Sequence, residues 1–234
     1  MSTAVISRNP TTRVVHIPAE WGSLVAELSS PEDPFGVIVF ARTNGSHRKA
    51  QRDQQLADAL HDAGFATLMF DLLTPGEEFV DAPIRALRVD LALLSRRLIE
   101  VVDWIVDEPG MSESGIGLFG EGMGAAPAFV TACVRPHRIA AVVALADRLD
   151  GATPVLARVH AASLIIVSGN DPNDLRSNEA AFQRLCCPKQ LVHVASDRFT
   201  TTGDTDSEVS RLTLDWFSRT MTPVPALIGV DESR

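Results

Sequence analysis

The sequence GLFGEGMGAAPAF, residues 117–129, joins an apolar run to a small-residue segment through three closely spaced glycines. Glycine adopts backbone conformations that other residues avoid, so Gly120, Gly122 and Gly124 predict a tight turn between a strand and a helix. The spacing is that of G-x-S-x-G, in which a serine is presented on a strained strand-to-helix turn. Because Gly122 occupies the central position, this turn carries no attacking atom.

Outward from this turn, buried strands and amphipathic helices alternate along the chain. GVIVFA at 36–41 is a continuous apolar run of the kind that a parallel strand buried on both faces requires. Leu91, Leu94 and Leu98 belong to an apolar stripe at helical spacing. A further helix is expected between the last two strands. The other predicted strands are 12–18, 22–28, 65–70, 115–119, 140–146, 163–169 and 190–195, and the predicted helices are 49–63, 86–106, 124–133 and 207–218.

This alternation predicts the fold class. Strands and helices that follow one another at these lengths form an α/β fold with a mostly parallel central sheet and helices on both faces. The first two strands are expected to form an antiparallel N-terminal edge. We expect a single domain over residues 1–234, with a core at about 12–220 and a C-terminal tail at 221–234.

Composition narrows the class of function. A chain of 234 residues with 45% hydrophobic content is long enough to bury a full core. Its net charge of -9 disfavours nucleic acid and anionic membranes as partners. No segment has the length and apolarity of a membrane span or a signal peptide, so we expect a cytoplasmic protein. The three cysteines and the histidine spacing indicate neither a disulfide framework nor a metal site, and no cofactor is expected.

Candidate site residues lie directly after the predicted strands, because ligands of open α/β sheets bind beyond the carboxyl ends of the strands. Carboxylates and arginines that converge there predict either a polar ligand site or plain salt bridges, such as Asp171–Arg198 or Asp197–Arg42. Glu77 and Glu78 are interpreted as solvated loop charges. The candidates at this edge are Arg42, Thr43, Asn44, Glu121, Gly122, Met123, Arg148, Asp171, Asp197 and Arg198.

Five stretches together resemble the small dienelactone-hydrolase-type members of the α/β-hydrolase superfamily, from about residue 12 to 220. They are VIVFARTNGSHR, AGFATLMFDLLTPGEE, the turn with GMGAA behind it, SGND, and ASDRF. The resemblance implies an α/β-hydrolase fold in which nucleophile, acid and histidine follow successive strands in that order. It places Gly122 at the nucleophile position, Asp171 at the acid position and Asp197 at the histidine position.

The sequence departs from this pattern at the positions that carry the chemistry. Gly122 has no side chain, and the carboxylate of Asp197 does not replace a proton-shuttling imidazole at neutral pH. Deleting the nucleophile or the base of such a triad costs about 10⁶-fold in kcat. We therefore expect no ordinary serine or cysteine hydrolysis here. The backbone N–H of Met123 and one N–H from the loop at 42–44 would still form an oxyanion hole.

Three functions remain open. The first is a pseudoenzyme or binding protein for a small polar or carbonyl-containing molecule. The second is a lyase, isomerase or carboxylate-driven hydrolase that uses Glu121, Asp171 or Asp197 as an acid or base in the same pocket. The third is a scaffold that acts as a homo-oligomer or with a protein partner, in which case side chains should fill the vacated pocket.

Overall fold

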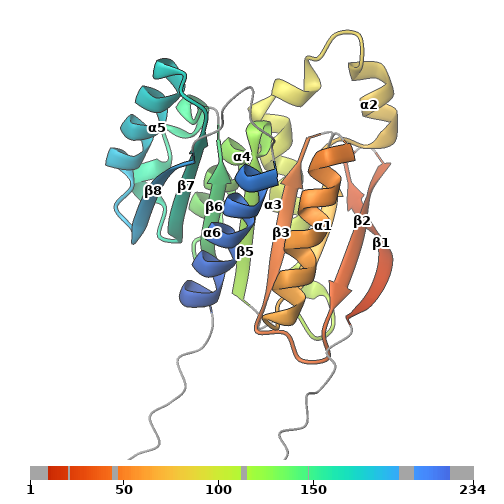
Figure 1. The fold of residues 1–234 in the computed structure, drawn as a ribbon. Helices are drawn as coiled ribbons and strands as arrows, with labels where there is room; N and C mark the ends of the chain where they lie inside the picture. The colour runs from red at the N-terminus through yellow and green to blue at the C-terminus, as the bar shows by residue number, and fades with distance from the viewer. Residues whose placement is uncertain are drawn as a thin grey trace, which may run out of the picture.

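The computed structural model describes residues 10–20, 22–43, 47–111, 115–146, 148–194 and 203–221, with the side chains of 47–50 and 203–204 left out. In this part of the chain eight strands form one sheet, in the order β1-β2-β4-β3-β5-β6-β7-β8 (Figure 1). The strands are β1 Thr11–Ala19, β2 Gly22–Ser30, β3 Gly36–Arg42, β4 Ala66–Asp71, β5 Gly115–Glu121, β6 Ile139–Leu145, β7 Ala162–Ser168 and β8 Lys189–Val194. The α-helices are α1 His47–Asp62, α2 Pro75–Asp81, α3 Leu91–Asp107, α4 Ala125–Val134, α5 Pro172–Arg184 and α6 Gly203–Met221.

The sheet is parallel except at its N-terminal edge. β1 pairs antiparallel with β2, and β2 pairs antiparallel with β4, while all pairs from β4 through β8 are parallel. The predicted α/β class with an antiparallel edge is therefore confirmed. None of the helices within the described residues combines the length and the apolarity that a bilayer crossing requires.

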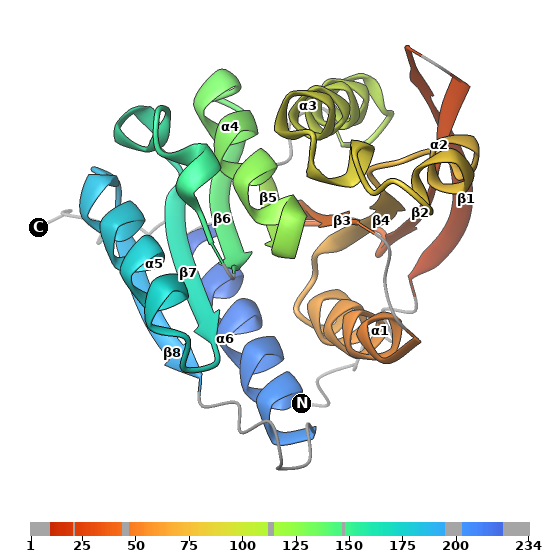
Figure 2. The same cartoon turned by 90° about the horizontal axis from the view of Figure 1, so that it is seen from above.

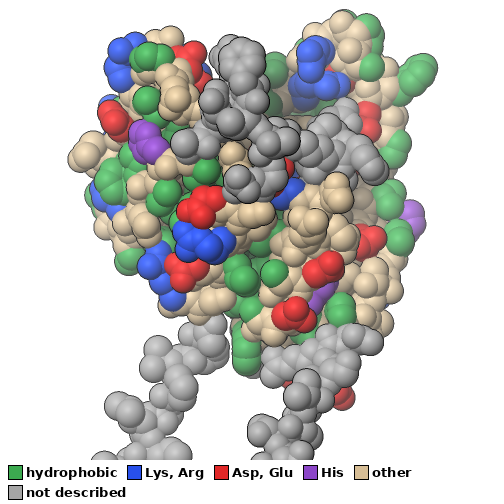
Figure 3. Space-filling view, viewed as in Figure 1, with side chains coloured by type: hydrophobic (Ala, Val, Ile, Leu, Met, Phe, Trp, Pro, Cys, Tyr) green, Lys and Arg blue, Asp and Glu red, His purple; other side chains and the backbone are tan. Residues whose placement is uncertain are grey.

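Helices cover both faces of the sheet, which explains the continuous apolar strands. Along β3, Val37 and Val39 enter the core under α3 and α4, whereas Ile38 and Phe40 enter the core under α1 and α6. Figure 2 shows α1 and α6 on one side of the twisted sheet and α3 and α4 on the other. Because successive strand side chains point to opposite faces, a strand buried on both sides must be apolar throughout. The face seen in Figure 3 carries interspersed acidic and basic side chains.

Two local predictions between β4 and α3 are wrong. The predicted helix over 86–106 is divided into a 3-10 turn, η1 at Leu87–Val89, and the longer α3. Asp90 separates them because its carboxylate accepts from the backbone N–H groups of Ala92 and Leu93, which makes it the N-cap of α3.

The segment expected to be a loop with solvated glutamates contains α2. Thr74 and Glu77 form a capping box at its start, with a proline at the first helical position. Glu77 is half-buried, and its carboxylate accepts from the fully buried Arg97 at 2.6 Å. Glu78 is also half-buried, and burial raises its pKa. The interpretation of these two residues as solvated charges is therefore wrong.

The glycine turn joins β5 to α4 through η2, a 3-10 turn at Gly122–Gly124. A Cβ atom at Gly120 would lie 2.6 Å from the carbonyl oxygen of Gly124, and one at Gly124 would collide with the carbonyl of Ala41. Only glycine permits these approaches, so the two outer glycines are required by close packing of the helix on the sheet. Gly122 differs, because its φ of +53° places it in the left-handed region.

Candidate functional site

The candidate site lies where the strand order reverses. β3 has β4 on one side and β5 on the other, so the connections that follow β3 and β5 leave to opposite faces of the sheet. In α/β sheets the crevice at such a switch point is the usual ligand position. Arg42 ends β3 and Glu121 ends β5, which places both at this crevice.

Among the residues that the structure describes, none fills the space over Gly122. A Cβ atom added there would meet no atom of the described residues within 4 Å. A pocket of about 210 Å³ begins at this point and is bounded by α3, α4 and the segment after β6. We call it the elbow pocket. Its lining residues are Val89, Leu91, Leu94, Gly122, Met123, Ala126, Arg148, Asp150 and Gly151.

The polar rim of the elbow pocket is an ordered ion pair. The Arg148 guanidinium donates to Oδ2 of Asp150 through Nε at 2.7 Å and Nη2 at 2.5 Å. The Ser177 hydroxyl, from α5, donates to Oδ1 of Asp150 at 2.9 Å. The Ser177 hydrogen bond, followed by the hydrogen bond and the charge of Arg148, holds the pKa of Asp150 below its ordinary value. These contacts place the Arg148 guanidinium at the pocket mouth, where both members of the pair are exposed to solvent.

A second group of charges lies on the α1 side of the same edge. We call it the sheet-edge network, and it contains Arg42, Arg52, Asp53, Asp71 and Glu121. Nη2 of Arg52 donates to Asp53 Oδ1 and to Glu121 Oε2, each at 2.6 Å. Nη1 of Arg42 lies 3.8 Å from Asp53 Oδ2, and its Nε lies 3.7 Å from Asp71 Oδ1. The network therefore ties α1 to the ends of β3, β4 and β5.

Burial sets the charge states in this network. The Asp53 side chain is 1% exposed, and burial raises the pKa of its carboxyl although the Arg52 charge opposes the shift. Burial lowers the pKa of the Arg52 guanidinium, but hydrogen bonding to Glu121 and the charges of both carboxylates outweigh it, so the net shift is upward. Arg52 is thus a permanent cation between two acids.

Several predicted site residues converge as expected. Gly122, Met123 and Arg148 line one pocket, and Thr43 lies half-buried just beyond the end of β3. Arg42 faces the carboxylates of Asp53 and Asp71. Its predicted pairing with Asp197 falls outside the described residues. Asn44, Asp197 and Arg198 lie outside the described residues.

The two described acid candidates do not act as unpaired acids in the pocket. Glu121 is ion-paired with Arg52. Asp171 is exposed and caps α5, where its carboxylate accepts from the backbone N–H of Asn173 at 2.8 Å. An acid or base with a raised pKa requires a carboxylate that is buried without a cationic partner. Neither Glu121 nor Asp171 meets this requirement.

Arg52 and Asp53 were missed by sequence reasoning. They lie on α1 one turn before Leu56 and Ala57, which belong to the buried stripe of that helix. Residues four apart share a helix face, so the stripe itself places the charged pair against the sheet. Continuing the periodicity by one turn would have identified both residues.

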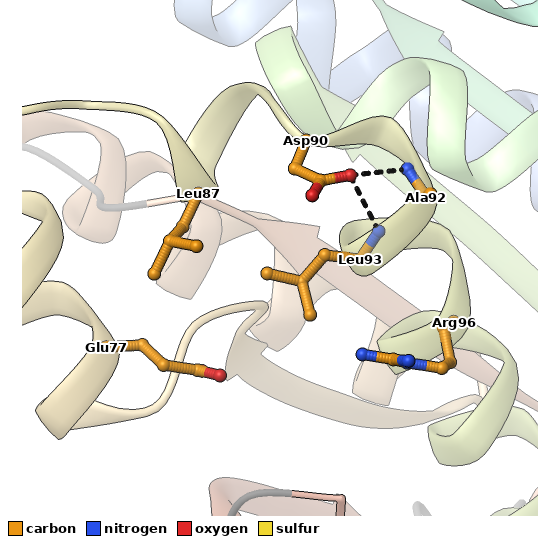
Figure 4. Close-up of a pocket in the computed structure, with 6 residues that line it drawn as sticks. All are labelled: Glu77, Leu87, Asp90, Ala92, Leu93 and Arg96. Carbon is orange, nitrogen blue, oxygen red and sulfur yellow. Dashed lines mark hydrogen bonds between the residues drawn. The ribbon is translucent and has the colours of Figure 1, made fainter.

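A second hollow, of about 510 Å³, lies between α2, η1 and the first turns of α3 (Figure 4). Its charged groups already have partners: Glu77 accepts from Arg97 and from the Thr74 N–H, and Arg96 pairs with Glu20 at 2.6 Å. It contains none of the predicted site residues. Within the described ranges no group of three or more acidic, histidine or cysteine side chains is arranged to hold a metal ion.

The fold has close counterparts among known structures. No family model matches the chain. A dienelactone hydrolase from Anabaena variabilis superposes with a TM-score of 0.84 at 33% identity, over 91% of this chain and 99% of the other. A dienelactone hydrolase-like promiscuous phosphotriesterase from metagenomic libraries superposes with a TM-score of 0.70 at 18% identity, over 91% and 99% of the two chains, which shows the fold alone.

Two curated proteins from strains of Mycobacterium tuberculosis, each named "Putative phosphoribosyl transferase", are 38% identical over 196 residues. The match covers 83% of this chain but 43% of each relative, so the chain spans less than half their length. The Anabaena enzyme, by contrast, is matched over nearly its whole length at 33% identity. On that similarity, the chain belongs to the dienelactone-hydrolase family of the α/β-hydrolase fold.

Proposed function

We propose that the protein binds a small molecule in the elbow pocket and does not cleave it through a residue at position 122. The observation that supports this is the open space over Gly122, which leaves a pocket at the family's reaction position with no nucleophilic side chain in its turn. A scaffold without ligand function would be expected to fill this space with side chains. In this proposal, the turn that presents a nucleophile in a hydrolase forms part of a ligand-binding pocket instead.

The lining indicates the chemistry of the ligand. Leu91, Leu94 and Met123 offer apolar contacts, and Arg148 offers hydrogen-bond donors at the mouth. The 3-10 turn Gly122–Gly124 precedes α4, and the backbone N–H groups at the start of such a turn, that of Met123 among them, have no acceptor inside it, so they are suited to a carbonyl oxygen. We expect a ligand with an apolar body and one carbonyl or other polar group, small enough for about 210 Å³.

The other functions have less support. An acid–base enzyme would have to rely on Asp197, since Glu121 is ion-paired and Asp171 is exposed. The transferase name of the Mycobacterium proteins refers to chains more than twice as long as the matched segment, so that activity is not carried over to this chain.

Binding is tested with acetophenone, an aromatic ketone, titrated into ¹⁵N-labelled protein. We expect saturable shifts of the amide signals of Gly122, Met123 and Gly151. Ala126→Phe should abolish them because the larger side chain fills the pocket, whereas Val130→Phe, one turn further along α4 and outside the pocket lining, should not. Shifts that persist in Ala126→Phe, or no saturable shifts at all, would contradict the proposal.

Catalysis is tested separately with p-nitrophenyl acetate. We expect no release of p-nitrophenol above the buffer rate under multiple-turnover conditions. Turnover by the wild type that is lost in Ala126→Phe and kept in Val130→Phe would overturn the non-hydrolytic assignment while leaving the binding site in place. The binding proposal and the non-hydrolytic assignment can therefore be contradicted independently of each other.

A further inference from the structure

A groove between the outer surfaces of α3 and α4 leads away from the elbow pocket. It has a volume of about 540 Å³, and Leu91 lines both the groove and the elbow pocket. Beyond Leu91, the groove is lined by Ser95 and Ile99 from the next two turns of α3 and by Val130 of α4. We call it the seam groove.

The two helices that bound the seam groove run in the same direction. α3 leads into β5 and α4 leads into β6, and these strands are parallel, so both helices begin at the carboxyl edge of the sheet. Figure 2 shows them side by side on one face of the sheet. On α4, Ala126 lines the elbow pocket and Val130, one turn later, lines the seam groove. The groove therefore continues the elbow pocket away from the glycine turn.

An ion pair bridges the two helices beyond the far end of the groove. Arg135, directly after α4, donates to both carboxylate oxygens of Asp103 on α3, through Nε and Nη2 at 2.7 Å each. Asp103 lies one turn beyond Ile99 on α3. The part of the groove from Leu91 to Ile99 is about 12 Å long, at a helical rise of about 1.5 Å per residue.

The lining of the seam groove favours an aliphatic chain. Leu91, Ile99 and Val130 offer methyl groups for contact, and Arg96 at the rim is already paired with Glu20 at 2.6 Å. Methylene groups gain free energy when such a surface removes them from water. A polar chain would lose its hydrogen bonds to water there without equivalent partners.

We propose that the ligand is a linear aliphatic carbonyl compound, with its carbonyl group in the elbow pocket and its hydrocarbon chain in the seam groove. The inference rests on the proposed function, and the volume of the elbow pocket then limits only the carbonyl end of the ligand. An extended chain with C–C bonds of about 1.5 Å advances by about 1.3 Å per carbon. About nine carbons therefore cover the distance from Leu91 to Ile99.

The test is a series of ketones titrated into ¹⁵N-labelled protein: methyl ethyl, methyl butyl, methyl hexyl and methyl octyl ketone. We expect the dissociation constant to fall by about two- to threefold for each added methylene, since complete burial of a methylene corresponds to about fourfold. The amide signals of Ile99 and Val130 should shift with methyl octyl ketone and not with acetophenone, which is too short to enter the groove.

Val130→Phe fills the groove and should remove most of the gain with chain length, whereas Val14→Phe should keep it. Val14 is exposed on β1, and its neighbours Val15 and Ile17 enter the core under α3 and α4, so Val14 lies on the opposite face of the sheet. Ala92→Phe is a second groove variant. The Ala92 side chain is exposed, so this substitution leaves the core intact. Circular dichroism checks that each variant is folded.

Equal dependence on chain length in the wild type and in both groove variants would overturn the inference. Acetophenone binding without any gain from a longer chain would also overturn it, while leaving the proposed function in place. Absence of binding by every ketone would contradict the proposed function together with the inference.

Two further outcomes would assign the groove differently. Binding of methyl octyl ketone that survives Ala126→Phe would separate the groove from the elbow pocket and overturn the inference. Sedimentation equilibrium tests for a second copy of the chain as the occupant. A wild-type dimer that becomes monomeric in Val130→Phe would identify the groove as an interface between copies, which would likewise overturn the inference.

Discussion

Arg52 binds Glu121 at the carboxyl edge of the sheet, with 2.6 Å between Nη2 and Oε2, and so fixes α1 to the last residue of β5. The next residue is Gly122, so the ion pair borders the glycine turn between β5 and α4. The Glu121 carboxylate is thereby engaged in an ion pair on the α1 side of this edge, and it is not among the residues that line the elbow pocket.

Arg52→Met should lower the free energy of unfolding by about 3–5 kcal/mol, because Asp53 stays buried and loses the counter-ion that hydrogen-bonds to it. Urea denaturation at neutral pH measures the change. The control is Arg211→Met on α6, where the pair with Glu208 is exposed on both sides and is worth less than about 1 kcal/mol. Equal losses of stability in the two variants would show that solvent screens the charges of the sheet-edge network.

The glycines of the turn should differ in their tolerance of a methyl group. Gly124→Ala drives a Cβ atom into the Ala41 carbonyl and should cost at least about 1–3 kcal/mol through overpacking. Gly122→Ala meets open space, so only its positive φ opposes the change, at a cost of about 1 kcal/mol. Urea midpoints of both variants test the order, and a larger loss for Gly122→Ala would refute this account of the turn.

Stability should depend on pH through His61. This side chain is buried and its Nε2 lies 2.8 Å from the Thr67 hydroxyl, and burial lowers its pKa below the ordinary 6.5 despite the charges of Asp58, Asp62 and Glu27. The unfolded chain therefore binds the proton more readily than the folded chain. The contribution of His61 to the free energy of unfolding is fully present above about pH 6.5. It decreases as the pH falls, by at most about 1.4 kcal/mol per pH unit.

Urea denaturation of wild type and His61→Gln between pH 8 and pH 5 checks this. The slope due to His61 should disappear in the variant, whereas His160→Gln, at an exposed position, should keep it. An unchanged slope in His61→Gln would assign the pH dependence to other groups.

The rim of the elbow pocket gives a prediction about a single carboxyl group. Ser177→Ala should raise the pKa of Asp150 toward its ordinary value, because the Ser177 hydrogen bond contributes most to holding it down. Arg148→Gln should raise it too, because it removes a hydrogen bond and a positive charge from the same carboxylate. Carbon-13 NMR titration of the Asp150 carboxyl measures both variants, and an unchanged pKa in Ser177→Ala would contradict this account of the rim.

The strands could be predicted because a strand that is buried on both faces is apolar at every position. Val37 through Ala41 are apolar without interruption since two cores require them. The division of the 86–106 helix was not predicted, because the apolar stripe continues through Leu87 while the carboxylate of Asp90 competes locally for the backbone N–H groups. The capping box of Thr74 and Glu77 follows the S/T-x-x-E pattern, so α2 could have been predicted from the sequence.

The site was partly predictable from the fold class. Residues that follow strands must reach the carboxyl edge, which placed Arg42, Glu121 and Gly122 correctly. Chain order does not specify which helix residues meet them, so Arg52 and Asp53 were missed. The position of Asp171 was predicted, but its use as a helix cap depends on the local geometry of α5, which the family resemblance did not convey.

Gly120 and Gly124 are held in place by the backbone atoms they approach, whereas Gly122 approaches none among the described residues. The two outer glycines are therefore required by the contact between the strand and the helix, and selection for packing alone is enough to preserve their spacing. A reactive side chain at the centre can then be lost or regained in evolution by one substitution, without rebuilding the architecture around it.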